Sequence, residues 1–246
     1  MKKLNLAIAF GTFLLISGQV YSQIPILDAY DEPLPKVVTP GLQIPDGGQA
    51  APSDAVSLFN GSDLSEWTND KGNVEWTVHD GMFTVKDGAG SIHTKREFGD
   101  FQLHIEWMHP SDITGEGQNR GNSGIFMHGL YEVQVLESYN NNNKTYVNGQ
   151  AGAIYKQHPP LVNPLKEPGN WNTYDIIFSA PTFNTDGTYK TNPRITVLIN
   201  GILVQNNAVI YGGTSGDKIV NKTRGGIMLQ DHHCTVNYRN IWIREL

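Results

Sequence analysis

A series of short alternating runs most constrains what this chain can fold into. Between residues 56 and 246, Gly, Asn, Asp and Pro separate these runs, and no segment keeps a helical period for more than about two turns. Asn200-Gly201 and Asp80-Gly81 each separate two runs and are typical of hairpin turns, because both positions tolerate a positive φ. We predict strands over residues 76–78, 82–85, 101–108, 124–128, 131–136, 173–179, 194–199, 202–205, 226–229 and 236–245.

Many strands without long helices or internal repeats predict an all-β fold. We expect a two-sheet antiparallel β-sandwich of the jelly-roll type. The chain has one cysteine, Cys234, so no disulfide can form within a monomer, and burial of apolar surface must stabilise the domain. A domain of about 190 residues is large enough for such a core.

The N-terminal residues predict an export signal. Lys2 and Lys3 precede an apolar run over residues 4–16, and the small-residue site 20–22 follows. This pattern predicts a Sec signal peptide over residues 1–22 and a periplasmic or secreted protein that is not membrane-bound after cleavage. No cysteine lies near the cleavage site, so we expect no lipoprotein.

The next segment differs in composition from the rest of the chain. Residues 23–54 are rich in Pro, Gly, Asp and Gln. Such a composition cannot build a core and predicts an extended leader or linker. We therefore place the globular domain at residues 55–246.

The acidic balance of the chain restricts its partners. The formal net charge is −6 and the pI is about 5.7. No basic patch is available to meet phosphates, so we expect no nucleic-acid partner. The oligomeric state is left open.

Ionisable and amide side chains occur on the non-core faces of three predicted strands. Because side chains alternate along a strand, Glu132 and Gln134 lie on one face and the neighbouring valines on the other. Glu106 has the same position on an earlier strand, and Gln230 and His232 on a later one. In a twisted sandwich such faces can line one concave groove, a common place to bind sugars. We expect these groups to meet in one groove.

Other interpretations apply to several of these residues. A lone Glu is often only a solvated strand position. Arg120 can hold a carboxylate and brace the turn before Asn122. Glu137 lies on the valine face, where it is either buried and paired or turned outward by a bulge. Trp171, in a polar loop, is the best candidate for an exposed ring that stacks on a sugar.

The sequence leaves a divalent metal open. No Cys/His cluster has zinc spacing and no EF-hand loop occurs. Glu106, Glu132 and His232 would form a carboxylate–histidine site if they converge. The loop 184–187 could hold a structural calcium.

Taken in order, the motifs of the chain resemble the family called domain of unknown function 1080, or 3-keto-disaccharide hydrolase. The matching segments are 58–67, 99–107, Asn122-Ser-Gly-Ile-Phe126, Tyr131-Glu-Val-Gln-Val-Leu-Glu137, Gly152-Ala-Ile-Tyr155, 171–174, 200–201, 226–232 and 238–241. The resemblance covers about residues 56–246 and implies a concanavalin-like jelly roll that breaks glycosides bearing a ketone at C3. Two departures, Met127-His128 and Glu137, leave the choice of substrate open.

The implied reaction explains the residue types. A C3 ketone acidifies the hydrogen on C2, so a base can remove it, an enolate forms and the group at C1 leaves; water can then add. This route needs a base, an acid for the leaving oxygen, and donors for the enolate. Glu132 or His232 is the candidate base, and Glu106 the candidate acid or ligand.

Further residues are candidates for binding the carbohydrate. Arg120, Gln134 and Lys156 would donate to its oxygens. The motifs add substrate-binding candidates at Asn122, Glu137, Tyr155, Trp171, Gln230 and Asp231. A non-catalytic carbohydrate-binding module on the same fold is the alternative. A retaining glycosidase would need a second nearby carboxylate, which the position two residues after Glu132 lacks.

Overall fold

A computed structural model describes residues 42, 44, 48–214 and 220–246 of the 246-residue chain. All described residues belong to one compact unit of the chain. The predicted signal peptide and most of the predicted leader lie outside the described residues. Within the described ranges, no helix has the length and apolar character needed to cross a membrane.

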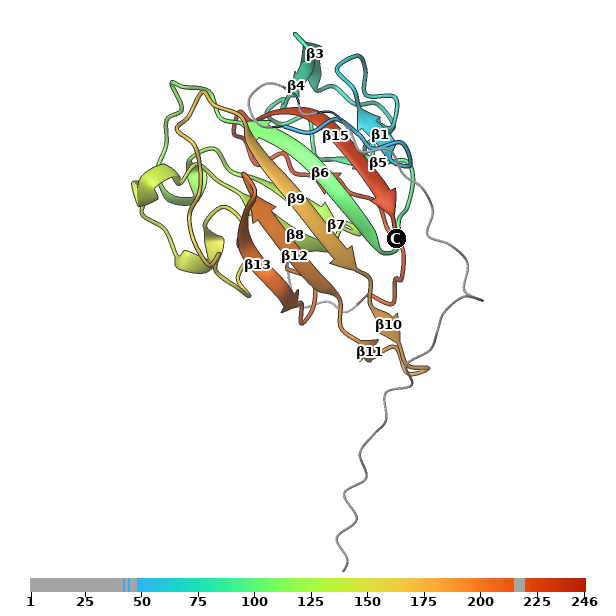
Figure 1. Ribbon diagram of the computed structural model, residues 1–246. Coiled ribbons are helices and arrows are strands. Elements are labelled where there is room, and N and C mark those ends of the chain that lie inside the picture. The colour runs from blue at the N-terminus through green and yellow to red at the C-terminus, as the bar shows by residue number, and fades with distance from the viewer. Residues whose placement is uncertain (1–41, 43, 45–47, 215–219) are drawn as a thin grey trace, which may run out of the picture. The chain divides into compact units, whose positions relative to one another are not determined.

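Eight antiparallel strands form the larger sheet, in the order β13-β12-β9-β6-β15-β4-β3, with β1 also paired to β15. Figure 1 shows its central strands β6, β9, β12 and β15 lying side by side. Its strands are β1 (Val56–Phe59), β3 (Thr77–His79), β4 (Met82–Thr84), β6 (Phe101–Met108), β9 (Asn172–Ser179), β12 (Arg194–Ile199), β13 (Ile202–Val209) and β15 (Asn237–Glu245).

Five antiparallel strands form the second sheet, in the order β2-β5-β14-β7-β8. This sheet lies behind the larger one in Figure 1, so the domain is a two-layered sandwich. The predicted antiparallel jelly roll is confirmed. The remaining elements are β2 (Trp67–Thr68), β5 (Ile92–Thr94), β7 (Ser123–Met127), β8 (Tyr131–Val135), β14 (Met228–Leu229), a small hairpin of β10 (Thr182–Phe183) and β11 (Tyr189–Thr191), and the 3-10 turns η2 (Gly117–Asn119), η3 (Tyr139–Asn141) and η4 (Val147–Gly149).

The core lies between the two sheets and follows the predicted alternation. Leu103, Ile105 and Trp107 of β6 point inward and are fully buried. Val133 and Val135 of β8 meet them from the other sheet and are equally buried. The opposite face of each strand therefore points away from the core, and these outer faces carry the polar groups of interest.

The predicted hairpins are confirmed by their backbone angles. Asn200 and Gly201 have φ of 51° and 78° between β12 and β13. Asp80 and Gly81 have φ of 48° and 75° between β3 and β4. Both pairs adopt the left-handed conformation that such a turn requires.

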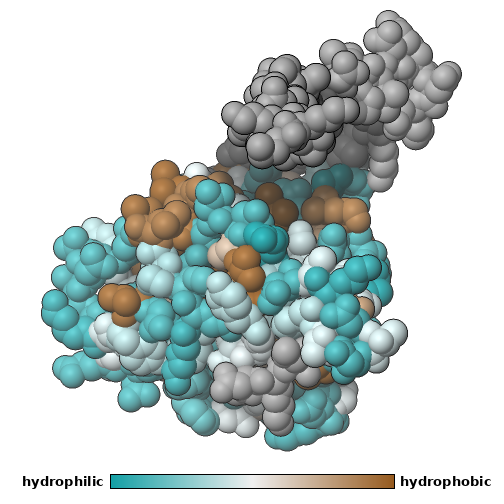
Figure 2. All heavy atoms as spheres, turned by 90° about the horizontal axis from the view of Figure 1, so that it is seen from below, coloured by the Kyte–Doolittle hydropathy of each residue, from teal (hydrophilic) through white to brown (hydrophobic). Residues whose placement is uncertain are grey.

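The surface seen from below is mainly hydrophilic, with apolar side chains in separate patches (Figure 2). Among the described residues, large apolar side chains that are well exposed include Leu42, Val147, Leu161 and Tyr211. These residues belong to segments far apart in the sequence. Their scattered exposure is ordinary for a folded domain.

Candidate active site

The polar faces predicted to share one groove lie on opposite sides of the sandwich. Glu106 projects from β6 in the larger sheet, on the face opposite Ile105. Glu132 projects from β8 in the smaller sheet, on the face opposite Val133. The packed core lies between the two sheets, so the expected single groove is wrong, and so is a metal site shared by Glu106, Glu132 and His232. Sequence alternation shows which face a residue occupies within its strand, but not to which sheet that strand belongs.

Strand register places five side chains in one row across the outer face of the smaller sheet. Directly paired residues of an antiparallel sheet share a face. Glu132 pairs with Phe126 of β7, and Phe126 pairs with Met228 of β14. Met228 pairs in turn with His93 of β5, which pairs with Thr68. Glu132 therefore ends a row that crosses the whole sheet.

A glycine in the neighbouring row makes room for the Glu132 carboxyl group. Gly124 pairs directly with Gln134, and its carbonyl accepts a hydrogen bond from the Gln230 N–H at 3.0 Å. A Cβ atom at Gly124 would lie 2.5 Å from Glu132 Oε1 and 2.7 Å from Phe126 Cε2. No side chain fits at this position, because Glu132 and Phe126 both lie across it.

Two tyrosines and a lysine approach Glu132 from the loop between β8 and β9. The Tyr155 N–H donates to the Glu132 carbonyl at 3.2 Å, which ties this loop to β8. The Tyr155 and Tyr146 hydroxyl oxygens are 2.5 Å apart. Lys156 follows with a left-handed φ of 59°, and its exposed ammonium group acts electrostatically on Glu132. The predicted residues Glu132, Tyr155 and Lys156 are thus brought together.

The protonation of Glu132 is set by its environment. Burial raises the pKa of Glu132 to about 8, and the positive charge of Lys156 only partly opposes this shift. Burial, the hydrogen bond with Tyr155 and the charge of Glu132 raise the pKa of Tyr146. Glu132 can therefore gain or lose a proton near neutral pH, while Tyr146 keeps its proton and can donate it.

Three amide oxygens of the described residues are buried without a hydrogen-bond partner: Gln134 Oε1, Gln150 Oε1 and Gln230 Oε1. Gln134 and Gln230 flank Gly124 on the outer face. The Gln134 Nε2 donates to Gln118 Oε1 at 2.9 Å, which fixes the direction of its free oxygen. Buried acceptors normally have a donor, so these unsatisfied oxygens are an unusual feature of this face.

A cavity of about 590 Å³ borders the same sheet beyond Met228. A second cavity, of about 300 Å³, shares His93 and Met228 with it. Met228 lies two strands from Glu132 in the same row, so the cavities continue the outer face without reaching Glu132 itself. The larger cavity is lined by Thr68, His93, His128, Leu130, Lys222 and Met228, among others.

Arg120, which is half-buried, and the buried Glu137 form an ion pair that braces the neighbouring loops. The Arg120 Nε donates to Glu137 Oε2, and its NH1 donates to the Ile113 carbonyl at 3.0 Å. Glu137 Oε1 accepts from the Tyr139 N–H at 2.9 Å. Asn122 is used similarly, since its Nδ2 donates to the Gln118 carbonyl at 2.7 Å. Their polar groups are committed to holding loops in place.

The segment after β14 carries the remaining predicted residues. Asp231 accepts from the N–H groups of Gly90 at 2.9 Å and His233 at 3.1 Å, so it braces the turn. His232 follows Gln230 by two positions and is half-buried. Asp87, Asp231 and His233 offer three potential metal-ligand atoms within 4.8 Å of one another, but His233 Nδ1 and Asp87 already pair at 2.5 Å.

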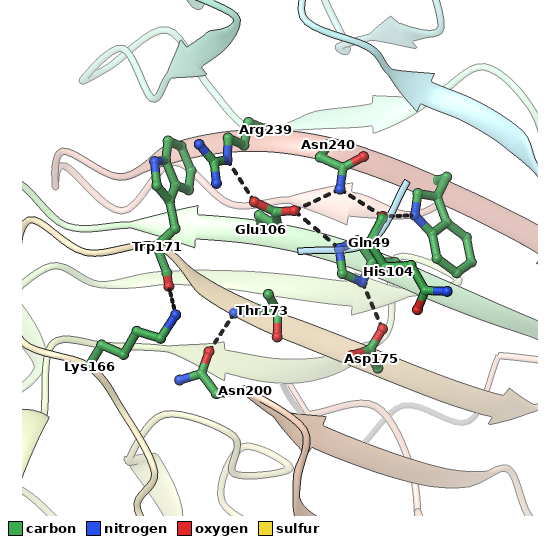
Figure 3. A network of polar contacts seen from close by, with 11 residues as sticks. Gln49, His104, Glu106, Lys166, Trp171, Thr173, Asp175, Asn200, Arg239 and Asn240 are labelled. Carbon is green, nitrogen blue, oxygen red and sulfur yellow. Dashed lines mark hydrogen bonds and ion pairs between the residues drawn. The ribbon is translucent and has the colours of Figure 1, made fainter. Parts of the chain in front are cut away.

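Glu106 and Trp171 lie on the outer face of the larger sheet (Figure 3). Trp171 is half-buried, and the Arg239 guanidinium lies 4.1 Å from the centre of its ring. Glu106 accepts from Arg239 Nε at 2.6 Å and from Asn240 Nδ2 at 2.7 Å. Neither residue belongs to the Glu132 site.

Sequence reasoning missed Tyr146 and His93. Tyr146 follows an asparagine-rich segment, and the sequence of this polar loop does not indicate a functional aromatic residue. His93 lies in a strand of three residues, too short to show alternation. Only strand pairing reveals that His93, Met228 and Glu132 share a row.

The sequence and the fold are both similar to those of known proteins. Residues 54–244 match the 3-keto-alpha-glucoside-1,2-lyase-like domain. The chain belongs to this family. The expected resemblance is thereby confirmed, and the domain is assigned to the carbohydrate-active proteins. No curated protein matches the chain.

Several solved structures share this fold over most of their length. One, named "putative glycosyl hydrolase" and from Parabacteroides distasonis ATCC 8503, is 55% identical, with a TM-score of 0.84 over 87% of this chain and 93% of that chain. Two others of the same name and organism are 20% and 24% identical, with TM-scores of 0.56 and 0.55. They cover 77% and 78% of this chain and 92% and 99% of their own, and support the fold alone.

Proposed function

We propose that the domain cleaves 3-keto-glycosides by elimination, with Glu132 as the base. The observation that carries this proposal is the buried Glu132 carboxyl group, whose pKa of about 8 suits proton transfer near neutral pH. Its position on β8, beside Lys156 and the Tyr146–Tyr155 pair, supports the assignment. Family membership supports the substrate class.

The proposed reaction breaks the C2–H and C1–O bonds and moves two protons, one to Glu132 and one to the leaving oxygen. The Glu132 carboxylate takes the C2 proton, which the C3 ketone has acidified, and the electron pair moves onto the ketone oxygen as an enolate. The enolate reforms the ketone, the C1–C2 double bond forms, and the C1–O bond breaks. The leaving oxygen takes a proton from the enzyme, so the products are an unsaturated 3-keto sugar and an alcohol. Addition of water to the double bond would complete a net hydrolysis.

The groups near Glu132 supply the other functions that the elimination needs. Tyr146 and Tyr155 share a hydrogen bond, and the raised pKa of Tyr146 keeps it protonated at neutral pH, so this pair supplies the proton for the leaving oxygen. The Lys156 ammonium group stabilises the negative charge of the enolate.

The test compares one glycoside with its 3-keto form, using the wild-type protein and the Glu132→Gln variant. Cleavage of only the oxidised sugar, reduced at least about 10²-fold in the variant, supports the proposal. Binding of both sugars without cleavage would instead indicate a carbohydrate-binding module. A parallel reaction with a chelator shows whether a divalent metal takes part.

A further inference from the structure

The outer face of the larger sheet carries a second polar cluster, remote from Glu132. His104 and Glu106 project from β6, Asp175 from β9, and Arg239 and Asn240 from β15 toward one point (Figure 3). A break in register between Arg239 and Trp242, with φ of 44° at Asn240, places two successive residues of β15 on this face. Two aromatic rings flank the cluster: Trp171 lies against Arg239, and Trp242 stacks on His104 with ring centres 5.1 Å apart.

Residues 48–54, named the strap here, cover this cluster. Gly48 lies directly on the Glu106 carboxylate, since a Cβ atom at position 48 would collide with Glu106 Oε1. The Gln49 carbonyl accepts from Asn240 Nδ2 and from Trp242 Nε1, both at 2.9 Å. Asp54 anchors the far end through its ion pair with Arg244 at 3.0 Å. The family match begins at residue 54, so most of the strap precedes the family domain.

The Gln49 carbonyl of the strap accepts hydrogen bonds from the cluster but cannot donate one to Glu106. Asn240 Nδ2 donates to both the Gln49 carbonyl and Glu106 Oε1, so these two acceptor oxygens are neighbours. A hydroxyl group in place of the carbonyl would accept the same two N–H groups and also donate its proton to Glu106, which a carbonyl cannot do. An adjacent hydroxyl group of the same sugar, and contact of its ring with the indoles of Trp171 and Trp242, would complete recognition.

The energetics also indicate recognition rather than stability. Glu106 is wholly buried and ionised, on a face that lies outside the apolar core. Buried ionic clusters seldom stabilise a fold more than apolar side chains of the same size would. We infer that this face is a second binding site, for a saccharide with neighbouring free hydroxyls, and that the strap occupies it as an internal ligand.

The Gly48→Ala variant of the full chain tests this inference, because the added methyl group should displace the strap. Gly212→Ala is the matched control, since a Cβ atom there meets nothing within 4 Å. Both are made in the Glu132→Gln background, so that turnover on the opposite face does not contribute. Amide hydrogen exchange over residues 48–54 reports strap release, and calorimetry reports binding of cellotetraose or maltotetraose.

The expected result is faster exchange in Gly48→Ala and at least tenfold tighter binding of one tetrasaccharide than in the control. Adding Asn240→Ala should abolish this gain. If exchange becomes faster over residues 48–54 but binding does not improve, the proposed saccharide site is wrong. Unchanged slow exchange over residues 48–54 would also contradict the proposal. If Gly48→Ala does not fold, Asp54→Ala releases the strap by removing its ion pair with Arg244.

Discussion

Glu106 and Glu132 point away from each other, out of opposite sheets of one sandwich. Burial alone would raise the pKa of Glu106, but hydrogen bonds from His104, Asn240 and Arg239 outweigh it, so the pKa is lowered. Glu132 lacks such donors among the described residues, and burial raises its pKa to about 8. Glu106 is therefore ionised at neutral pH, whereas Glu132 is suited to transfer protons.

The pH dependence of cleavage should report the ionisation of Glu132. The base is active when deprotonated, so kcat/KM should rise tenfold per pH unit below about 8 and level off above it. A pH–rate profile measures this rise of kcat/KM with pH. A profile that is flat from pH 6 to 9 would contradict the assignment of Glu132 as base.

Stability should change with pH in the opposite direction. The folded-state pKa of Glu132 is above its unfolded value, so its contribution to stability is fully present below the unfolded pKa of 4.5 and is lost as pH rises toward about 8. This loss should disappear in Glu132→Gln, which chemical denaturation at several pH values would show.

Gly124→Ala should disable the site without changing its ionisable groups. The added methyl group would displace the Glu132 carboxyl group and the Phe126 ring. We expect kcat/KM to fall about 10²-fold, as for a catalytic group displaced by about 1 Å. Gly212→Ala, in open space, should retain full activity. Equal activity of the two variants would show that Glu132 is not held where catalysis needs it.

The tyrosine pair should matter only for leaving groups that need a proton. Tyr146→Phe and Tyr155→Phe each break the hydroxyl contact. With an alkyl leaving group, we expect a loss of about 10²–10⁴ in kcat. With 4-nitrophenolate, which leaves without protonation, most activity should return. A similar loss for both substrates would assign the tyrosines a structural role.

His104 should make the domain less stable as pH rises above neutrality. Burial lowers its pKa, but Asp175 at 2.7 Å and Glu106 at 3.4 Å outweigh burial and raise the pKa to about 8. Because the folded value exceeds the unfolded 6.5, the stabilisation is complete below pH 6.5 and lost through pH 8. The loss should be about 2 kcal/mol in wild type. His104→Gln should remove this dependence in urea unfolding; an unchanged slope would contradict it.

Much of the fold could be predicted because strand period and turn chemistry are local properties. The 101–108 and 194–199 strands were predicted with their observed bounds, and Asn200-Gly201 forms the expected hairpin. The short strands β2 and β5 were missed because so few positions show no period, whereas the equally short β3 and β4 were predicted from the turn signal between them. β13 extends to Val209 through polar residues that pairing with β12 holds in the sheet.

The site could be predicted only in part because its assembly is not local. Glu132 and Gln134 were placed on the right face by alternation, Tyr155 was named from the motif, and Lys156 was named as a donor to the oxygens of the carbohydrate. The assignment of Glu106 to the same groove failed because pairing of β6 with β15, rather than with β7 or β8, decides its sheet. Neither the β15 bulge at Asn240 nor the strap over Glu106 follows any sequence period.

The most direct test of the central claim is the isotope effect at C2. A 3-keto-glucoside carrying deuterium at C2 would be compared with the unlabelled sugar in kcat/KM, using the wild-type protein and Glu132→Gln. If Glu132 removes the C2 proton, wild type should cleave the deuterated sugar more slowly, and the variant should lose at least about 10²-fold in rate. Equal rates for the two sugars, with cleavage retained in Glu132→Gln, would contradict elimination and the role of Glu132 together.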